Sequence, residues 1–307
     1  MICTDKARQI RTMVDSGICE NELARLYGVR EDTIRRYLDF SKPKPKSKAP
    51  KILLFDIETS TVWARLWGIR KQHVGHYQVI EGKEWFTISW SAMWLHDGKI
   101  MSDCVTPKQA LMRNDESVLM GIWNLINEAD ITIAHNAKRF DVRKLNGRFV
   151  ILDLPKPGSF EIIDTLIQAQ KQFAFTSHKL DYLNTLFSLR KKDPTDFDLW
   201  IKCEEGDQES LDYMLQYNQS DVIALKELYL KIRPWMTSHP NLALYVDDEE
   251  KMCTVCMSKR LTREGSYHTV ASSFPEFRCN DCTSLVRSRF SETSKGKRRN
   301  LLVPIAR

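Results

Sequence analysis

No segment of the chain approaches the ~20 consecutive apolar residues needed to cross a bilayer. Residues 1–10 also lack the apolar stretch of a signal peptide. Cysteine is too sparse for a secreted disulfide scaffold, with eight residues in a chain of 307. Together with an ordinary hydrophobic content of 42%, these absences predict a globular protein of the cytoplasm that makes no contact with a membrane.

Charge is distributed unevenly along the chain. Residues 1–51 carry 12 Lys/Arg against 7 Asp/Glu, a net charge of +5, and residues 236–307 carry 12 against 8, a net charge of +4. The middle, residues 52–235, has a net charge of −3. Basic ends suit contact with phosphates, which dominates affinity for nucleic acids. Solvated tails are the alternative, and the charge pattern alone leaves both open.

Two changes in composition divide the chain. Residues 42–51 contain three prolines and five lysines, which predicts an extended, charged linker. Between Pro240 and Lys251 the sequence becomes polar, with four acidic residues in a row. We therefore expect a helical module at 1–41, an α/β domain at 52–238 and a C-terminal module at 239–307.

The N-terminal module is predicted to be entirely helical, with helices at 5–15, 20–27 and 30–40. The string from Glu22 to Leu38 resembles a helix-turn-helix. In that arrangement the third helix presents Arg30, Arg35 and Arg36 toward DNA. A three-helix unit for dimerisation or docking is the alternative interpretation.

The middle segment alternates strand and helix patterns. Continuous apolar runs predict buried strands, and apolar residues at helical spacing predict amphipathic helices. The predicted strands are 51–57, 86–95, 99–105, 131–134 and 160–164, and the predicted helices are 116–128, one that begins at Phe140, and 210–232. This alternation indicates an α/β sandwich with a mixed sheet.

Acidic residues stand at particular places in these elements. Asp56 and Glu58 lie two residues apart at the end of the first strand, so they share one face. Adjacent carboxylates repel unless cations compensate them, although acidic pairs at strand ends are common without one. Asp141 opens a helix and can project toward the same strand end. Tyr217 and Asp221 are four residues apart, which places them on one face of the long helix.

These residues together resemble the three exonuclease motifs of the DnaQ-like superfamily, which has the RNase H-like fold. The matching positions are Asp56-x-Glu58, His135-Asn136 with Phe140-Asp141, and Tyr217-x-x-x-Asp221. Tyrosine in the third motif marks the variant called DEDDy. The histidine variant is excluded, because Gln216 and Tyr217 occupy the places where its histidine would stand. The resemblance covers about residues 51–235, and with the string Trp67 to Arg70 the layout is similar to standalone bacteriophage exonucleases.

The resemblance implies an RNase H-like mixed five-stranded sheet and a 3'-5' exonuclease. It implies that two Mg²⁺ or Mn²⁺ ions are bound, directly or through water, by Asp56, Glu58, Asp141 and Asp221. Two such ions about 3.5–4 Å apart can activate water and relieve charge on the leaving oxygen, and hard oxygen ligands favour them. Tyr217 is then expected to orient the attacking water.

The implied substrate is single-stranded DNA or a frayed 3' end, which Asn136, Arg35 and Arg36 are expected to contact. A ribonuclease or structure-selective endonuclease of the same fold is one alternative, and a DNA-binding regulator with a residual nuclease core is another. A phage-encoded protein would act in the cytoplasm of a bacterial host. A replication or recombination partner is conceivable, but the sequence does not identify one.

Three polar residues near the motifs have plainer interpretations. His135 is expected to be structural, Asp164 to cap the end of a strand, and Asp181 to lie at the surface. None of them fits a metal position in the motifs.

Four cysteines near the C-terminus form two Cys-x-x-Cys pairs, Cys253/Cys256 and Cys279/Cys282, separated by 22 residues. This spacing resembles a zinc ribbon with one structural Zn²⁺. A small aromatic core is expected from Tyr267, Phe274 and Phe277. Basic residues accompany the pairs: Arg278, Arg287, Arg289 and the run 295–299. They indicate nucleic-acid binding, with docking to a protein partner as the alternative.

Overall fold

A computed structural model describes residues 2–39, 49–68, 73–190 and 195–305. The chain divides into a first compact unit, which contains the sheet and runs to Leu228, and a second unit that begins at Tyr229. Most of the expected linker at 42–51 lies outside the described residues, as do Ile69 and Arg70. Within the described ranges, no helix is long and apolar enough to cross a membrane.

The first unit is built on a mixed five-stranded sheet in the order β3-β2-β1-β4-β5. Its strands are β1 (Ile52–Thr59), β2 (Thr87–Trp94), β3 (Ile100–Cys104), β4 (Ile131–Ala134) and β5 (Glu161–Asp164). Strand β1 pairs antiparallel with β2 and parallel with β4. The predicted mixed five-stranded sheet is confirmed, and the strand boundaries differ from the prediction by at most two residues.

Nine α-helices and all but the last turn of a tenth, α10, lie in the described part of the first unit. They are α1 (Ile2–Asp15), α2 (Glu20–Tyr27), α3 (Glu31–Asp39), α4 (Pro107–Leu111), α5 (Glu116–Glu128), α6 (Asp141–Ile151), α7 (Thr165–Gln172), α8 (Leu180–Leu186), α9 (Phe197–Glu204) and α10 (Gln208–Ile232). The sequence pattern did not predict α4, α7, α8 or α9, because helices of five to eight residues are too short to show a clear period.

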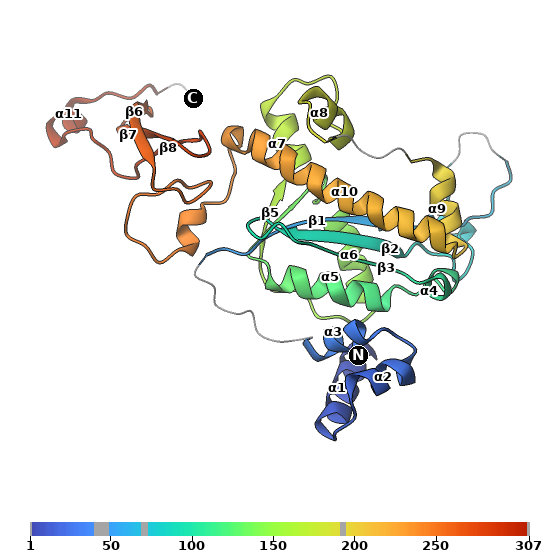
Figure 1. The fold of residues 1–307 in the computed structure, drawn as a ribbon. Coiled ribbons are helices and arrows are strands. Elements are labelled where there is room, and N and C mark those ends of the chain that lie inside the picture. The colour runs from blue at the N-terminus through green and yellow to red at the C-terminus, as the bar shows by residue number, and fades with distance from the viewer. Residues whose placement is uncertain (1, 40–48, 69–72, 191–194, 306–307) are drawn as a thin grey trace. The chain divides into compact units, whose positions relative to one another are not determined.

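The two faces of the sheet are covered by different helices. Helix α10 crosses one face and α5 the other, as Figure 1 shows. On the α10 side, Cys104 of β3 lies within hydrogen-bond distance of the Leu211 carbonyl oxygen, and Gln219 donates to Ser102. On the α5 side, the Trp90 indole of β2 donates to the Val118 carbonyl. Because side chains alternate along a strand, Asp56 and Glu58 fall on the face that α10 covers.

The N-terminal helices dock onto the α5 side of this sheet. Arg30 and Arg36 both form ion pairs with Asp103 of β3, which is only 3% exposed. The Tyr37 hydroxyl donates to the Glu116 carboxylate at 2.8 Å. Arg30 and Arg36 therefore hold the N-terminal helices against the sheet. Arg35 stays exposed and pairs with Glu20 of α2 and Glu31 of α3.

The second unit contains a three-stranded sheet and a short helix, namely β6 (Leu261–His268), β7 (Ser273–Cys279), β8 (Leu285–Arg287) and α11 (Lys295–Asn300). Its buried core consists of cysteine side chains and Val255. None of Tyr267, Phe274 and Phe277 belongs to this cluster, and Tyr267 is 46% exposed, so the expected aromatic core is wrong. Phe274 and Cys279 are an odd number of residues apart in β7 and therefore point to opposite faces, and the Arg287 guanidinium lies over the Phe274 ring, 4.3 Å from its centroid.

Replacing Arg36 with alanine should destabilise the first unit by about 2 kcal/mol. This is less than the ~3–5 kcal/mol typical of breaking a buried ion pair, because Arg30 still pairs with Asp103. The matched control is Arg35→Ala, whose solvent-exposed ion pairs should contribute little to stability. Denaturant unfolding of both variants measures the difference, and equal effects would contradict this account of docking.

Candidate active site and metal centres

Three carboxylates meet at the end of β1. Asp56 and Glu58 come from the strand and Asp221 from α10, and one oxygen from each can be chosen so that all three lie within 4.8 Å of one another. Asp221 is buried, with 2% of its surface exposed, while the two strand acids are half-buried. The fold thus brings together residues that are more than 160 positions apart in the sequence.

Asn218 holds one of these acids in place. Its amide nitrogen donates to Oδ2 of Asp56 at 2.6 Å, and the side chain is fully buried. Opposite the strand acids on β2 lie two buried serines, Ser91 beside Asp56 and Ser89 beside Glu58. The sequence analysis did not predict a role for Asn218. Its position next to Tyr217, on the helix that also carries Asp221, could have indicated one.

Asp141, the first residue of α6, is buried beside the same strand end. Burial raises its pKa to about 7, against the opposing effect of hydrogen bonds from its own amide and that of Ile57. Ile57 stands between Asp56 and Glu58 in β1, so the hydrogen bond from its amide brings Asp141 to the part of the strand that carries the two acids. Its carboxylate lies outside the group of three, and its Oδ1 has no hydrogen-bond partner among the described residues.

The loop between β4 and α6 is organised by Asp164. This buried carboxylate accepts hydrogen bonds from the backbone amides of Asn136 and Lys138. It stands at the end of β5, where a strand-end cap was predicted, and it caps the N-terminus of α7 by accepting from two amides of that helix. Asn136 adopts a positive φ of 75°. His135 is held through both ring nitrogens, by the Thr165 hydroxyl and the His178 carbonyl, which fits a structural role.

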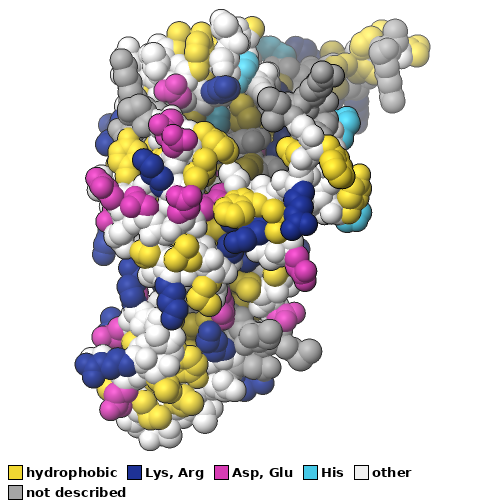
Figure 2. Space-filling model, turned by 90° about the vertical axis from the view of Figure 1, so that its right-hand side faces the viewer, with side chains coloured by type: hydrophobic (Ala, Val, Ile, Leu, Met, Phe, Trp, Pro, Cys, Tyr) yellow, Lys and Arg dark blue, Asp and Glu magenta, His cyan; other side chains and the backbone are white. Residues whose placement is uncertain are grey.

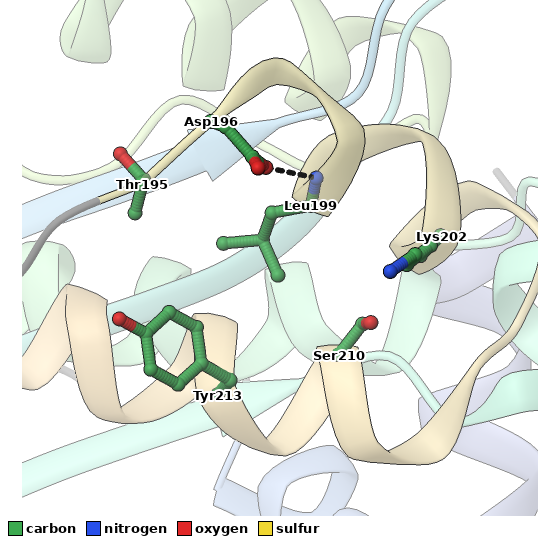
Figure 3. A pocket seen from close by; sticks show the side chains of 6 residues that line it. All are labelled: Thr195, Asp196, Leu199, Lys202, Ser210 and Tyr213. Carbon is green, nitrogen blue, oxygen red and sulfur yellow. Dashed lines mark hydrogen bonds between the residues drawn. The ribbon is translucent and has the colours of Figure 1, made fainter.

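Tyr217 is buried rather than exposed, with its ring edge-on to Trp200 of α9 at a centroid distance of 6.3 Å. One helical turn earlier, Tyr213 lines a polar cavity of about 350 Å³ between α9 and α10. Figure 3 shows its lining side chains, which come from these two helices and from the two residues before α9. Lys202 supplies the cationic group of this cavity.

A buried ion pair fixes the chain that leaves β1. Glu204 of α9 accepts hydrogen bonds from the amide and hydroxyl of Thr61 and from the Trp63 indole, each at 2.7 Å. Arg113 completes the group, 2.9 Å from Glu204. Burial by itself would raise the pKa of Glu204, but these hydrogen bonds outweigh it and hold the pKa below its ordinary value. We call Thr61, Trp63, Arg113 and Glu204 the Glu204 clamp.

The acidic cluster suits hard divalent cations. Its donors are carboxylate oxygens, the ligands that Mg²⁺ and Mn²⁺ prefer. The buried Oδ1 of Asp141, which lacks a partner among the described residues, offers a further acceptor at the same strand end. Buried acids without counter-charges repel one another, so bound cations would stabilise this arrangement.

The four cysteines form a second candidate metal centre. Their sulfurs lie within 4.8 Å of one another, with separations of 3.5 Å for Cys253–Cys282 and for Cys256–Cys279. Tetrahedral zinc with Zn–S bonds of ~2.3 Å sets sulfurs about 3.8 Å apart. The residue after each pair, Met257 or Thr283, has a positive φ near 63°. These two matching turns fit a closed four-thiolate site.

Basic side chains do not form one continuous surface on the face drawn in Figure 2, where lysines and arginines are interspersed with acidic residues. The surface charge of this face therefore does not by itself identify a path for a nucleic acid.

Comparison with known proteins matches one family model and a number of solved structures. Residues 53–233 match the model of the RNase_H superfamily. A solved structure of the family B DNA polymerase from the hyperthermophilic archaeon Pyrobaculum calidifontis is similar over 60% of this chain, with 17% identity and a TM-score of 0.45. The match covers 25% of that polymerase. No curated protein matches the sequence.

Glu204→Gln should lower the free energy of unfolding at pH 7 by about 3 kcal/mol, because Arg113 is left buried without a counter-charge. The folded-state pKa of Glu204 is below its unfolded value. Its contribution is therefore complete above the unfolded pKa and is lost as pH falls through the folded pKa. The free energy of unfolding should therefore differ less between wild type and Glu204→Gln as the pH is lowered from 7. Glu205→Gln, at an exposed neighbour, is the control and should change little at any pH.

Purified protein should contain one Zn²⁺ per chain, and Cys256→Ser should lose it. Because binding at such sites contributes ~10–16 kcal/mol to folding, chelation should expose residues 251–293 to protease. Metal analysis and limited proteolysis measure both effects. Cys19→Ser, at an exposed free cysteine, should retain the metal; a folded, protease-resistant second unit without metal would refute the assignment.

Proposed function

The chain belongs to the RNase_H superfamily, and on that premise we propose that it is a metal-dependent 3'-5' exonuclease acting on single-stranded DNA or frayed 3' ends. The observation that carries this proposal is the meeting of Asp56, Glu58 and Asp221 at one strand end. These are the residues on which the DnaQ-like resemblance rests, in its tyrosine variant. The superfamily fold itself is that of nucleases, so the coarser function is hydrolysis of nucleic acid.

The three clustered carboxylates are proposed to bind two Mg²⁺ or Mn²⁺ ions, with Asp141 as a fourth ligand directly or through water. When bound, such ions supply activation of water and neutralisation of charge on the leaving oxygen. The protein fixes the positions of the carboxylates that would bind these ions. Asn218 orients Asp56 through its 2.6 Å hydrogen bond, and the buried strand β1 fixes the spacing of the two strand acids.

Tyr217 and Asn136 are proposed to act on water and substrate. The edge-on contact with Trp200 restricts the orientation of the Tyr217 ring, which suits a residue that orients an attacking water by hydrogen bonding. Asn136 lies in a loop whose backbone Asp164 holds rigid. A strand end bound beside this loop would meet a fixed amide group rather than a mobile one.

The flanking modules are proposed to bind nucleic acid, the second unit through its zinc ribbon and basic tail. In the first unit Arg35 is the more exposed arginine of α3, and its ion pairs with Glu20 and Glu31 lie at the surface, whereas Arg36 is paired with the buried Asp103. A substrate contact by Arg36 would require that ion pair to open. The strand preference of the enzyme is therefore proposed to depend more on surfaces outside the helical module.

Asp56→Asn and Asp221→Asn should each abolish metal-dependent hydrolysis, because each removes a charge from the cation site. Wild-type protein with Mn²⁺ should release mononucleotides from 3'-labelled single-stranded DNA and show no activity in EDTA. Asp181→Asn, at an exposed acid of α8, is the matched control and should keep full activity.

The labelled products also distinguish the related functions. Cuts within circular DNA would show that the protein is an endonuclease rather than an exonuclease. Degradation of RNA alone would show that it is a ribonuclease. Undiminished activity in both acidic variants would overturn the site. Sequence-specific DNA binding without any metal-dependent turnover would instead identify a regulator.

A further inference from the structure

The connection between β1 and β2 carries a second feature of interest beyond the acidic cluster. It leaves the sheet at Ser60, directly after the strand that holds Asp56 and Glu58, and returns at Phe86. Within its described part, two large aromatic side chains, Trp67 and Tyr77, are almost fully exposed to solvent. Both line one cavity of about 740 Å³.

This exposure occurs on an ordered frame. Ala64 and Val79 form an antiparallel bridge, and the Arg65 amide donates to the Gln78 carbonyl at 2.8 Å. The Gln78 side chain ties the two arms together, since it donates to the Arg65 carbonyl and accepts from the Gly75 amide. At its base the connection is anchored by the Glu204 clamp.

Gly75 fixes the direction of one ring. A Cβ atom added at this position would collide with the Tyr77 ring, so the ring lies directly against the glycine backbone. The His76 ring meets Tyr77 edge-on at a centroid distance of 5.8 Å. Tyr77 is thus held in a defined orientation although most of its surface is in water.

Cations accompany the aromatic rings. Arg65 lines the same cavity, with Glu81 as the one acid among its lining residues. Nearer the sheet, the Lys83 ammonium lies over the Trp63 ring at 4.6 Å from the centroid. Figure 2, which views the first unit from this side, shows exposed hydrophobic side chains next to lysine and arginine side chains.

Aromatic faces beside cations suit unpaired nucleobases, because every base presents a π-face and its phosphate a negative charge. Arg65 is seven positions after Glu58, so at most ~25 Å of extended chain joins the cavity to the acidic cluster. A strand of a few nucleotides spans such a distance.

We propose that Trp67 and Tyr77, with Arg65 beside them, form a platform on which unpaired bases of a single nucleic-acid strand stack as the strand enters the acidic site. This inference rests on the proposed nuclease function for the identity of the strand. The platform adds recognition of bases to a cluster that can itself engage only the phosphodiester group. It selects unpaired over paired strands, since bases in a duplex have their faces covered by neighbours.

The test compares two strands that differ only in their bases. Fluorescence anisotropy measures the affinity of full-length protein for short oligothymidylate and for an abasic strand with the same number of phosphates, both without added Mg²⁺ or Mn²⁺, so that cleavage is prevented and the cysteine site keeps its metal. Wild type should bind oligothymidylate more tightly. The double variant W67A/Y77A should lose on the order of tenfold affinity per stacked base for oligothymidylate and nothing for the abasic strand.

Conservative and matched variants keep the test decisive. W67F/Y77F keeps both rings and should retain the base preference, and Trp235→Ala, at an exposed tryptophan outside the connection, should change nothing. Gly75→Ala should weaken oligothymidylate binding by displacing the Tyr77 ring. Unchanged affinity of W67A/Y77A overturns the proposal and would point to a protein partner for the exposed rings, and an equal loss on both strands overturns base recognition.

A separate measurement keeps the two proposals apart. Hydrolysis of bis(4-nitrophenyl) phosphate by wild-type protein with Mn²⁺ reports on the acidic site without any base. If that hydrolysis is absent while base-dependent binding persists, the nuclease proposal fails and the platform stands. If hydrolysis is present and base preference is absent in wild type, the platform fails alone.

Discussion

Mutual repulsion among carboxylates at the end of β1 is the constraint on which the rest of the first unit depends. Charges within 4.8 Å of one another repel by roughly 3 kcal/mol or more per pair at an effective dielectric near 20. The folded chain must offset this cost before any cation binds. It does so with a strand buried on both sides, an amide from Asn218 on Asp56, and a long helix whose packing fixes Asp221.

The two faces of the sheet differ in polarity as a consequence of this constraint. The α10 face carries the acids together with small polar side chains such as Ser89 and Ser91, which leave room for charge and water. The opposite face packs a largely apolar core against α5, and on it the buried Asp103 anchors the N-terminal helices through two arginines. A helical module that resembles a DNA-binding motif is thereby made part of the structural support of the catalytic sheet.

In the proposed nuclease, substrate choice is separated from the chemistry. The acidic cluster can engage only the phosphodiester group, which all nucleic acids share. The connection after β1 presents aromatic rings on a frame that the Glu204 clamp holds, and the second unit presents basic residues on a ribbon built around four cysteines. Features that differ among nucleic acids, such as unpaired bases, can therefore be recognised without disturbing the buried acids.

The sequence by itself determined what depends on local spacing. The apolar period of α5, the placement of Asp56 and Glu58 on one face, and the two Cys-x-x-Cys turns follow from patterns a few residues long. Only the tertiary structure decided the contacts that join distant positions: Asn218 to Asp56 across 162 residues, Arg113 to Glu204 across 91, and Arg36 to Asp103 across 67. These contacts depend on how whole elements pack, and an isolated asparagine, glutamate or arginine carries no local pattern that names its distant partner.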